Sequence, residues 1–216
     1  MADAAARSGR SADAVRLMAV TKTLPAETVS AAIQEGLSLF GENRVQEAAE
    51  KYTRLPGKWE LHLIGHLQRN KARDAANFFT CVQSIDKAET AEALSRARPE
   101  GADPLDVLLE MNTSGEESKH GVRSRDELLK CMEAVMALPG LRVRGLMTVG
   151  PLTEDRGAVR RAFAALSSLF HEVNGQGVPG FDTLSMGMSG DFEEAIEEGA
   201  TLVRIGSALF GSRNRP

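Results

Sequence analysis

Lys22 is the residue whose type and position most clearly suit a chemical reaction, because it comes just after a short apolar run at residues 17–20. Four apolar residues between Arg16 and Thr21 predict a strand that is buried on both faces. A lysine held at the end of such a strand loses water around its ammonium group, which lowers its pKa and makes the nucleophilic amine accessible. That amine suits a Schiff base with an aldehyde or ketone. A solvated lysine at a strand end is the alternative, and position alone favours it.

Two segments rich in glycine and serine follow late apolar runs, Met-Gly-Met-Ser-Gly at 186–190 and Arg-Ile-Gly-Ser at 204–207. Glycine lets backbone N–H groups approach an anion, and the hydroxyls of Ser189 and Ser207 can donate to it. The first segment opens onto a predicted helix, and we assign the acids at 191, 193 and 194 to its solvated face. Two ordinary tight turns are the alternative. With Lys22, the segments indicate a phosphorylated carbonyl compound as ligand.

The elements that must position these residues alternate along the whole chain. Eight strands, each followed by a helical pattern and a short connection, predict one parallel (β/α)8 barrel domain, a TIM barrel, over residues 1–216. Sites in such barrels form at the C-terminal ends of the strands, with phosphate commonly bound after strands seven and eight. A doubly wound open sheet is the alternative, although no glycine fingerprint follows the first strand. The predicted strands cover residues 17–20, 37–40, 59–64, 79–85, 105–111, 141–147, 181–186 and 201–205.

Composition narrows the classes of protein. A chain with 42% hydrophobic and 26% charged residues is ordinary for a globular protein. Its formal charge of −4 provides no excess of positive charge for binding nucleic acid or an anionic membrane. No apolar run reaches the length of a membrane span, and no signal-peptide core follows Met1. Cys81 and Cys131 lie in apolar segments, so we expect reduced core thiols and a cytoplasmic location, with a disulfide bridge between them as the alternative.

The histidines add no expected metal centre. His62, His66 and His120 share no ligand spacing with a cysteine, so the sequence predicts no metal site. His62 stands between two leucines and is interpreted as a hydrogen-bonded histidine of the barrel interior. Ser124 and Glu127 form a capping box that predicts the start of a helix ending near residue 138.

Several blocks in fixed order resemble the pyridoxal phosphate homeostasis proteins, also called proline synthetase co-transcribed proteins. The resemblance extends from about residue 4 to residue 213, and a set of blocks is far more specific than one motif. The blocks are AVTKT at 19–23, FGEN at 40–43, HLIGHLQ at 62–68, NTSGEESKHG at 112–121, GLMT at 145–148, LSMGMS at 184–189 and VRIGSALFG at 203–211.

The resemblance implies a fold like the N-terminal barrel of alanine racemase and pyridoxal 5'-phosphate (PLP) as a cofactor bound covalently through Lys22. It also implies that Arg204 faces the pyridine nitrogen and that Asn43 lies beside the cofactor. The implied phosphate contacts are Ser189, Gly206 and Ser207. Family members usually carry threonine where Ser207 stands, which keeps the hydroxyl. Their N-terminal helix is usually longer than the stretch at about residues 2–10, so we expect a less complete flanking helix.

Three functions are compatible with these residues: a PLP-binding protein of vitamin B6 and amino-acid homeostasis, a PLP-dependent racemase or decarboxylase, and a Schiff-base aldolase acting on a sugar phosphate. A racemase of the related fold uses a second domain and a tyrosine on the opposite face of the cofactor. The one tyrosine here, Tyr52, lies in a predicted helix. We therefore expect a monomeric carrier or regulator with no catalytic residues. The resemblance suggests apo forms of PLP-dependent enzymes as acceptors.

Overall fold

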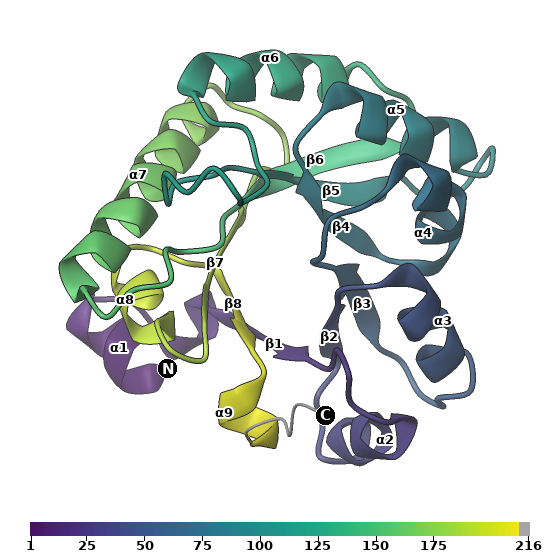
Figure 1. Cartoon of the computed structure of the whole chain (residues 1–216), viewed down its shortest axis with the longest axis horizontal. Helices are drawn as coiled ribbons and strands as arrows, with labels where there is room; N and C mark the ends of the chain where they lie inside the picture. Colours follow the sequence, from purple (N-terminus) through teal and green to yellow (C-terminus); the bar gives the residue numbers. More distant parts are fainter. Residues whose placement is uncertain (212–216) are drawn as a thin grey trace.

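The strands form a closed parallel barrel in the order β1 to β8, as a computed structural model of residues 1–211 shows (Figure 1). β8 pairs with β1, which confirms the predicted barrel and excludes an open sheet. Positions 212–216 of the predicted domain lie outside the described residues. The strands are β1 Arg16–Val20, β2 Leu39–Glu42, β3 Glu60–Leu63, β4 Cys81–Ile85, β5 Leu105–Glu110, β6 Leu141–Met147, β7 Thr183–Met188 and β8 Leu202–Ile205.

Helices surround the barrel, and a helix follows each strand (Figure 1). The cap predicted at Ser124 is confirmed, since its side chain accepts a hydrogen bond from the Glu127 N–H. The helices are α1 Ala2–Arg7, α2 Ala26–Gln34, α3 Val45–Tyr52, α4 Ala72–Phe78, α5 Ala88–Ala97, α6 Arg125–Met136, α7 Arg156–Asn174, α8 Phe192–Glu197 and α9 Ser207–Phe210. Two 3-10 turns, η1 Ala12–Ala14 and η2 Arg69–Lys71, precede β1 and α4.

The N-terminal helix α1 precedes β1 and packs against α8 on the outside of the barrel (Figure 1). Its buried face consists of Ala4 and Ala5. Arg7 pairs with Glu193 at 2.6 Å and with Glu197 at 2.7 Å. Exposed ion pairs of this kind contribute little to stability. The apolar contact of the two alanines therefore fixes α1 more than the charges do.

The barrel interior has an apolar layer with a polar layer above it. Two small apolar clusters fill the lower layer: one contains Met18, Leu39 and Leu202, and the other contains Cys81, Leu108 and Met147. Side chains two positions apart on a strand share a face. The inward position one step nearer the C-terminal end is polar on three strands, where Gln83, Glu110 and Arg204 stand. The polar layer therefore lies next to the end of the barrel where sites form.

Two strands, β2 and β7, end about two residues later than the sequence predicts. The apolar run at 37–40 stops at Gly41 and Glu42, which are typical of a turn, yet both belong to β2 and are buried. Glu42 stays in the strand because Lys51 contacts its carboxylate at 2.7 Å.

α9 was not predicted, since four residues carry little periodicity. No helix within residues 1–211 combines the length and apolar character needed to cross a membrane.

Candidate functional site at the C-terminal end of the barrel

Lys22 is half-buried and lies two residues beyond the end of β1. The register pairs Ala19 with Ile205 of β8 and Val20 with Gly41 of β2. Continued past the strand ends, this register places Lys22 beside Asn43 on one side and beside the loop after β8 on the other. The structure therefore brings Lys22, Asn43 and residues 206–207 to the same end of the barrel, as the sequence predicts.

A buried polar cluster behind β1 holds the backbone on the N-terminal side of Lys22. The Thr21 carbonyl accepts a hydrogen bond from Lys51 Nζ at 2.8 Å, and Thr21 Oγ1 donates to Glu42 Oε1 at 2.7 Å. The Tyr52 hydroxyl lies 2.6 Å from Thr21 Oγ1 and donates to it, since the Thr21 proton goes to Glu42. Burial raises the pKa of Tyr52 well above its ordinary value. These contacts fix Thr21, and with it the direction in which the chain leaves the strand.

The same cluster holds the C-terminal side of Lys22. The Thr23 N–H donates to the Glu47 carboxylate, and Lys51 Nζ contacts the same oxygen at 3.1 Å. Thr23 has a φ of +64°, a left-handed conformation that a β-branched residue seldom adopts. Because both neighbours are tied to one cluster, the backbone of Lys22 is fixed from two sides.

The charges in this cluster are almost completely withdrawn from water. The side chains of Lys51 and Glu42 are 6% and 0% exposed. Burial raises the pKa of Glu42, while the hydrogen bonds from Lys51 and Thr21 oppose that shift. Each partner therefore depends on the other, since an unpaired charge at this depth is strongly unfavourable.

The loops after β7 and β8 meet at one hydroxyl. Ser189 Oγ accepts hydrogen bonds from the backbone N–H groups of Gly206 at 3.1 Å and of Ala208 at 3.2 Å. Ser207 is exposed at the start of α9. Two N–H groups and the Ser189 hydroxyl thus gather beside Ser207, at a place where an anion can be bound.

The acids that follow these loops are less solvated than the sequence predicts. Asp191 is half-buried, and its carboxylate accepts the Met188 N–H at 2.6 Å. Glu194 has a 14% exposed side chain and pairs with Arg156 at 3.2 Å. The interpretation as a solvated face holds only for Glu193, whose side chain is 55% exposed. The acids brace the loop and do not occupy the anion position.

Arg204 is a buried cation on the inner face of β8, 4% exposed. Its guanidinium donates to Ser185 Oγ at 2.6 Å and to the Thr148 carbonyl at 2.7 Å. Burial lowers the pKa of Arg204 to about 10, and the charges of Asp191 and Glu110 oppose the shift. The group is therefore still positively charged at neutral pH.

A chain of hydrogen bonds continues from Arg204 across the barrel interior. Ser185 Oγ donates to Gln83 Oε1 at 2.7 Å, and Gln83 Nε2 lies 2.8 Å from His62 Nδ1. Because the amide nitrogen is a donor, His62 Nδ1 accepts and the ring proton lies on Nε2. Burial lowers the pKa of His62, which favours this neutral form. The interpretation of His62 as a hydrogen-bonded barrel residue is confirmed.

Sequence reasoning missed the interior groups Gln83, Ser185 and Glu110 as well as the cluster behind Lys22. The first three carried a signal, since each is a polar residue within a strand whose neighbouring positions are largely apolar and buried. A polar residue in such a strand indicates an inward position with a hydrogen-bond partner. Lys51 and Glu47 carried no signal, because they resemble ordinary polar residues of a surface helix.

The comparisons with known proteins agree with this fold. They place the chain in the class described as "Alanine racemase, N-terminal domain", whose family model matches residues 3–214. A pyridoxal phosphate homeostasis protein of Pseudomonas aeruginosa is 48% identical over 215 residues, which cover 98% of this chain and 90% of the relative. The chain belongs to the pyridoxal phosphate homeostasis protein family.

Solved structures give the same result. An unknown protein from Bifidobacterium adolescentis is similar with a TM-score of 0.88 and 36% identity, covering 97% of this chain and 89% of that chain. PipY of Synechococcus elongatus, solved with PLP bound, has a TM-score of 0.82 and 34% identity. The match covers 97% of this chain and 99% of PipY.

Replacing Lys51 with methionine should leave the Glu42 carboxylate buried without its cation. We expect a loss of about 3–5 kcal/mol in the free energy of unfolding, measured by urea denaturation. Lys58→Met, at an exposed lysine, is the matched control and should change stability by less than about 0.5 kcal/mol. The double variant Lys51→Met/Glu42→Gln should regain part of the loss. Equal stability of Lys51→Met and Lys58→Met would contradict the buried pair.

Glu110 should make stability depend on pH near neutrality. Burial, with a contribution from Asp86, raises its pKa to about 7. The native state therefore holds a proton that the unfolded chain releases near pH 4, so stability is full below that pH and falls as pH rises through 7. Glu110→Gln should remove this fall and be more stable than the parent at pH 8 by roughly 2 kcal/mol. Urea denaturation at pH 5 to 8 tests this, and parallel curves for both proteins would refute it.

Proposed function

We propose that this chain binds PLP at the C-terminal end of its barrel and acts in PLP and amino-acid homeostasis without strong catalytic activity of its own. The observation that carries the proposal is the convergence of the Gly206 and Ala208 N–H groups on Ser189 Oγ at the barrel end that also holds Lys22. PLP is a phosphorylated aldehyde, so it needs both an amine and an anion site. The PLP-bound structure of PipY, at 34% identity, supports this assignment.

The residues present fit the cofactor's phosphate. It carries negative charge and several acceptor oxygens, and the two N–H groups with the hydroxyls of Ser189 and Ser207 supply donors. The oxygen that now accepts both N–H groups is a neutral hydroxyl, and a phosphate oxygen is a stronger acceptor for the same pair. Ser189 can then rotate and donate in its turn. Lys22 would hold the aldehyde end, and Asn43 would lie beside the ring.

Arg204 is the residue we assign to the pyridine nitrogen. Bound PLP supplies an electron sink whose strength depends on a protonated ring nitrogen. A guanidinium is only a donor, so Arg204 would hold that nitrogen unprotonated and weaken the sink. Hydrogen bonds to Ser185 and to the Thr148 carbonyl hold the orientation of its guanidinium.

The position of Tyr52 argues against a racemase. Its hydroxyl lies against Thr21 behind β1, and burial raises its pKa further from the range of a useful base. With Tyr52 unavailable as the second base and a weak sink, removal of an amino acid α-proton by the racemase route lacks two of its usual requirements. A homeostatic carrier is therefore favoured over a racemase or decarboxylase, and the colour of PLP distinguishes it from an aldolase.

The remaining assignments are part of the same proposal. We propose a monomer in the cytoplasm that exchanges PLP with apo forms of PLP-dependent enzymes. Cys81 and Cys131 are free and buried, which is consistent with a reducing compartment.

The purified protein should be yellow, and borohydride reduction should attach a phosphopyridoxyl group to Lys22. The physical reason is the fixed backbone of Lys22 next to the anion site. Peptide mass spectrometry locates the adduct. Lys22→Ala should lose the colour, whereas Lys71→Ala should keep it. An adduct found only on Lys71 or Lys119 would refute the assignment of Lys22.

Exchange of the α-proton of alanine should be slow in the PLP-loaded protein. Arg204 would hold the ring nitrogen unprotonated, and Tyr52 is not placed to act as a base. Incubation with alanine in deuterated water, followed by NMR, measures the exchange, with free PLP at equal concentration as the control. Exchange much faster than in the control would show a working catalyst and rule out the carrier role.

A further inference from the structure

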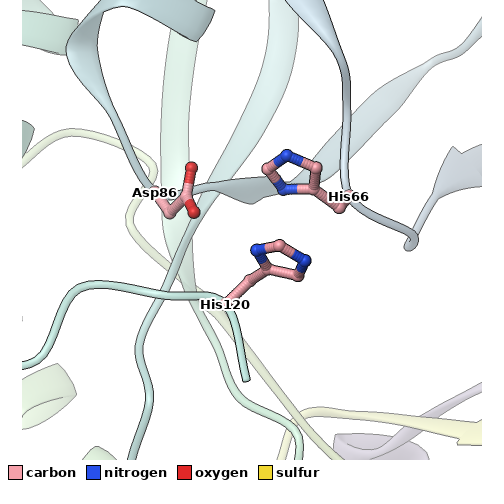
Figure 2. Close-up of side chains that lie close together, drawn as sticks. All are labelled: His66, Asp86 and His120. Carbon is pink, nitrogen blue, oxygen red and sulfur yellow. The ribbon is translucent and has the colours of Figure 1, made fainter. Parts of the chain in front are cut away.

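Three loops at the same end of the barrel bring together two histidines and a carboxylate that are not among the residues assigned to PLP. His66 follows β3, Asp86 follows β4 and His120 ends the loop after β5. One ligand atom from each residue lies within 4.8 Å of the other two. Figure 2 shows the two imidazole rings one above the other, with a nitrogen of each ring facing the Asp86 carboxylate.

The backbone that carries these side chains is tied together. Ser84 Oγ donates to the Gly65 carbonyl at 2.7 Å, which links the segments that bear Asp86 and His66. The base of the long loop is closed by the Asn112 N–H, which donates to the Val122 carbonyl at 2.9 Å. Gly121 has a φ of +108° and lies so close to the Asn112 backbone that a Cβ would meet its nitrogen at 2.6 Å. His120 is therefore held at a defined place beside the barrel mouth.

The contacts of these side chains suit the binding of a cation. Asp86 Oδ1 is buried and has no hydrogen-bond partner among the described residues. The rings of His66 and His120 are stacked, with centroids 3.9 Å apart and planes at 12°, an arrangement that two protonated imidazoles would avoid.

Carboxylate groups predominate around the cluster, although Lys87 adjoins Asp86 in the chain. Glu110 is a further carboxyl group that interacts with Asp86, and the two negative charges repel each other. A cation held by Asp86 would reduce the repulsion between the two carboxylates and would bind the unpaired Asp86 oxygen.

We propose that His66, Asp86 and His120 form a binding site for a divalent transition-metal ion of the Zn²⁺ type. Two imidazole nitrogens and one carboxylate oxygen are a ligand set that Zn²⁺, Co²⁺ and Ni²⁺ accept, whereas Mg²⁺ and Ca²⁺ prefer oxygen alone. Bonds of about 2.0–2.1 Å require ligand atoms roughly 3.3 Å apart in a tetrahedron. The present separations close to that value by rotation of the two exposed imidazoles, which also ends their stacking.

Three protein ligands leave the fourth position to water, so the ion would be exchangeable and accessible from the mouth of the barrel. His66, Asp86 and His120 follow β3, β4 and β5, whereas Lys22 follows β1, Asn43 follows β2 and Arg204 lies on β8. The two assignments share no residue, so they can be tested separately.

The test uses the full-length, tag-free protein as purified, treated with a chelator and then titrated with Zn²⁺ or Co²⁺. We expect one ion per chain by equilibrium dialysis and elemental analysis, and a visible Co²⁺ spectrum typical of four ligands. His120→Ala and Asp86→Asn should each weaken binding by more than about tenfold, a cost that losing even an outer-sphere partner can reach. His171→Ala is the matched control, since it removes an exposed histidine on α7 outside the cluster.

Parent affinity that persists in His120→Ala or Asp86→Asn would overturn the site, and so would a stoichiometry near zero. A decrease in His171→Ala equal to that in His120→Ala would also overturn it, because surface histidines would then be the ligands. The 222 nm circular dichroism of every variant checks folding. PLP absorbance recorded in the same samples keeps failure of the metal site separate from failure of PLP binding.

Discussion

The buried positive charge of Arg204 is the constraint on which the interior of this barrel depends. A guanidinium out of water is tolerated only when acceptors surround it, and here they come from Ser185 on β7 and the Thr148 carbonyl after β6. The Ser185 hydroxyl donates its own hydrogen bond to Gln83, which in turn donates to His62. One charge on β8 thereby fixes side-chain orientations on β7, β4 and β3. The polar layer is one chain of hydrogen bonds, in which the donor or acceptor role of each group is set by its neighbour.

A second buried charge acts from outside the barrel wall. Lys51 reaches from α3 to the Thr21 carbonyl and to the carboxylates of Glu42 and Glu47. These contacts hold the backbone on both sides of Lys22, while the Lys22 side chain extends from the strand end. The site is therefore supported from two directions: by Arg204 inside the barrel and by Lys51 behind it. Both supports stand on regular elements, which hold a site more precisely than loops do.

The barrel could be predicted from the sequence because buried parallel strands appear as short apolar runs, and those runs recur with helical patterns between them. Lys22 and the loops containing Ser189 and Gly206 could be predicted because they follow such runs. The C-terminal half of β2 could not, since Gly41 and Glu42 look like a turn until Lys51, nine residues later, neutralises the carboxylate. Such pairings depend on which helix face meets which strand, and no local spacing records that.

The grouping of His66, Asp86 and His120 was hidden for the same reason. A metal-binding motif is visible in a sequence when its ligands share one helix or one turn, because their spacing then repeats. Here each residue comes from a different loop, and the barrel closure alone brings the loops together. The prediction of no metal site rested on spacing to a cysteine, which tests only one kind of ligand set.

The two ends of the polar layer have opposite electrostatic character, and this division suits a site with two kinds of ligand. On the β1 and β8 side, Arg204 and the N–H groups of Gly206 and Ala208 present positive charge and donors. On the β3–β5 side, Glu110 and Asp86 present carboxyl groups. Glu110, with a pKa raised to about 7, is partly protonated at neutral pH and lessens the field between the two sides. The proposed anion site and the proposed cation site would therefore each face groups of the opposite charge.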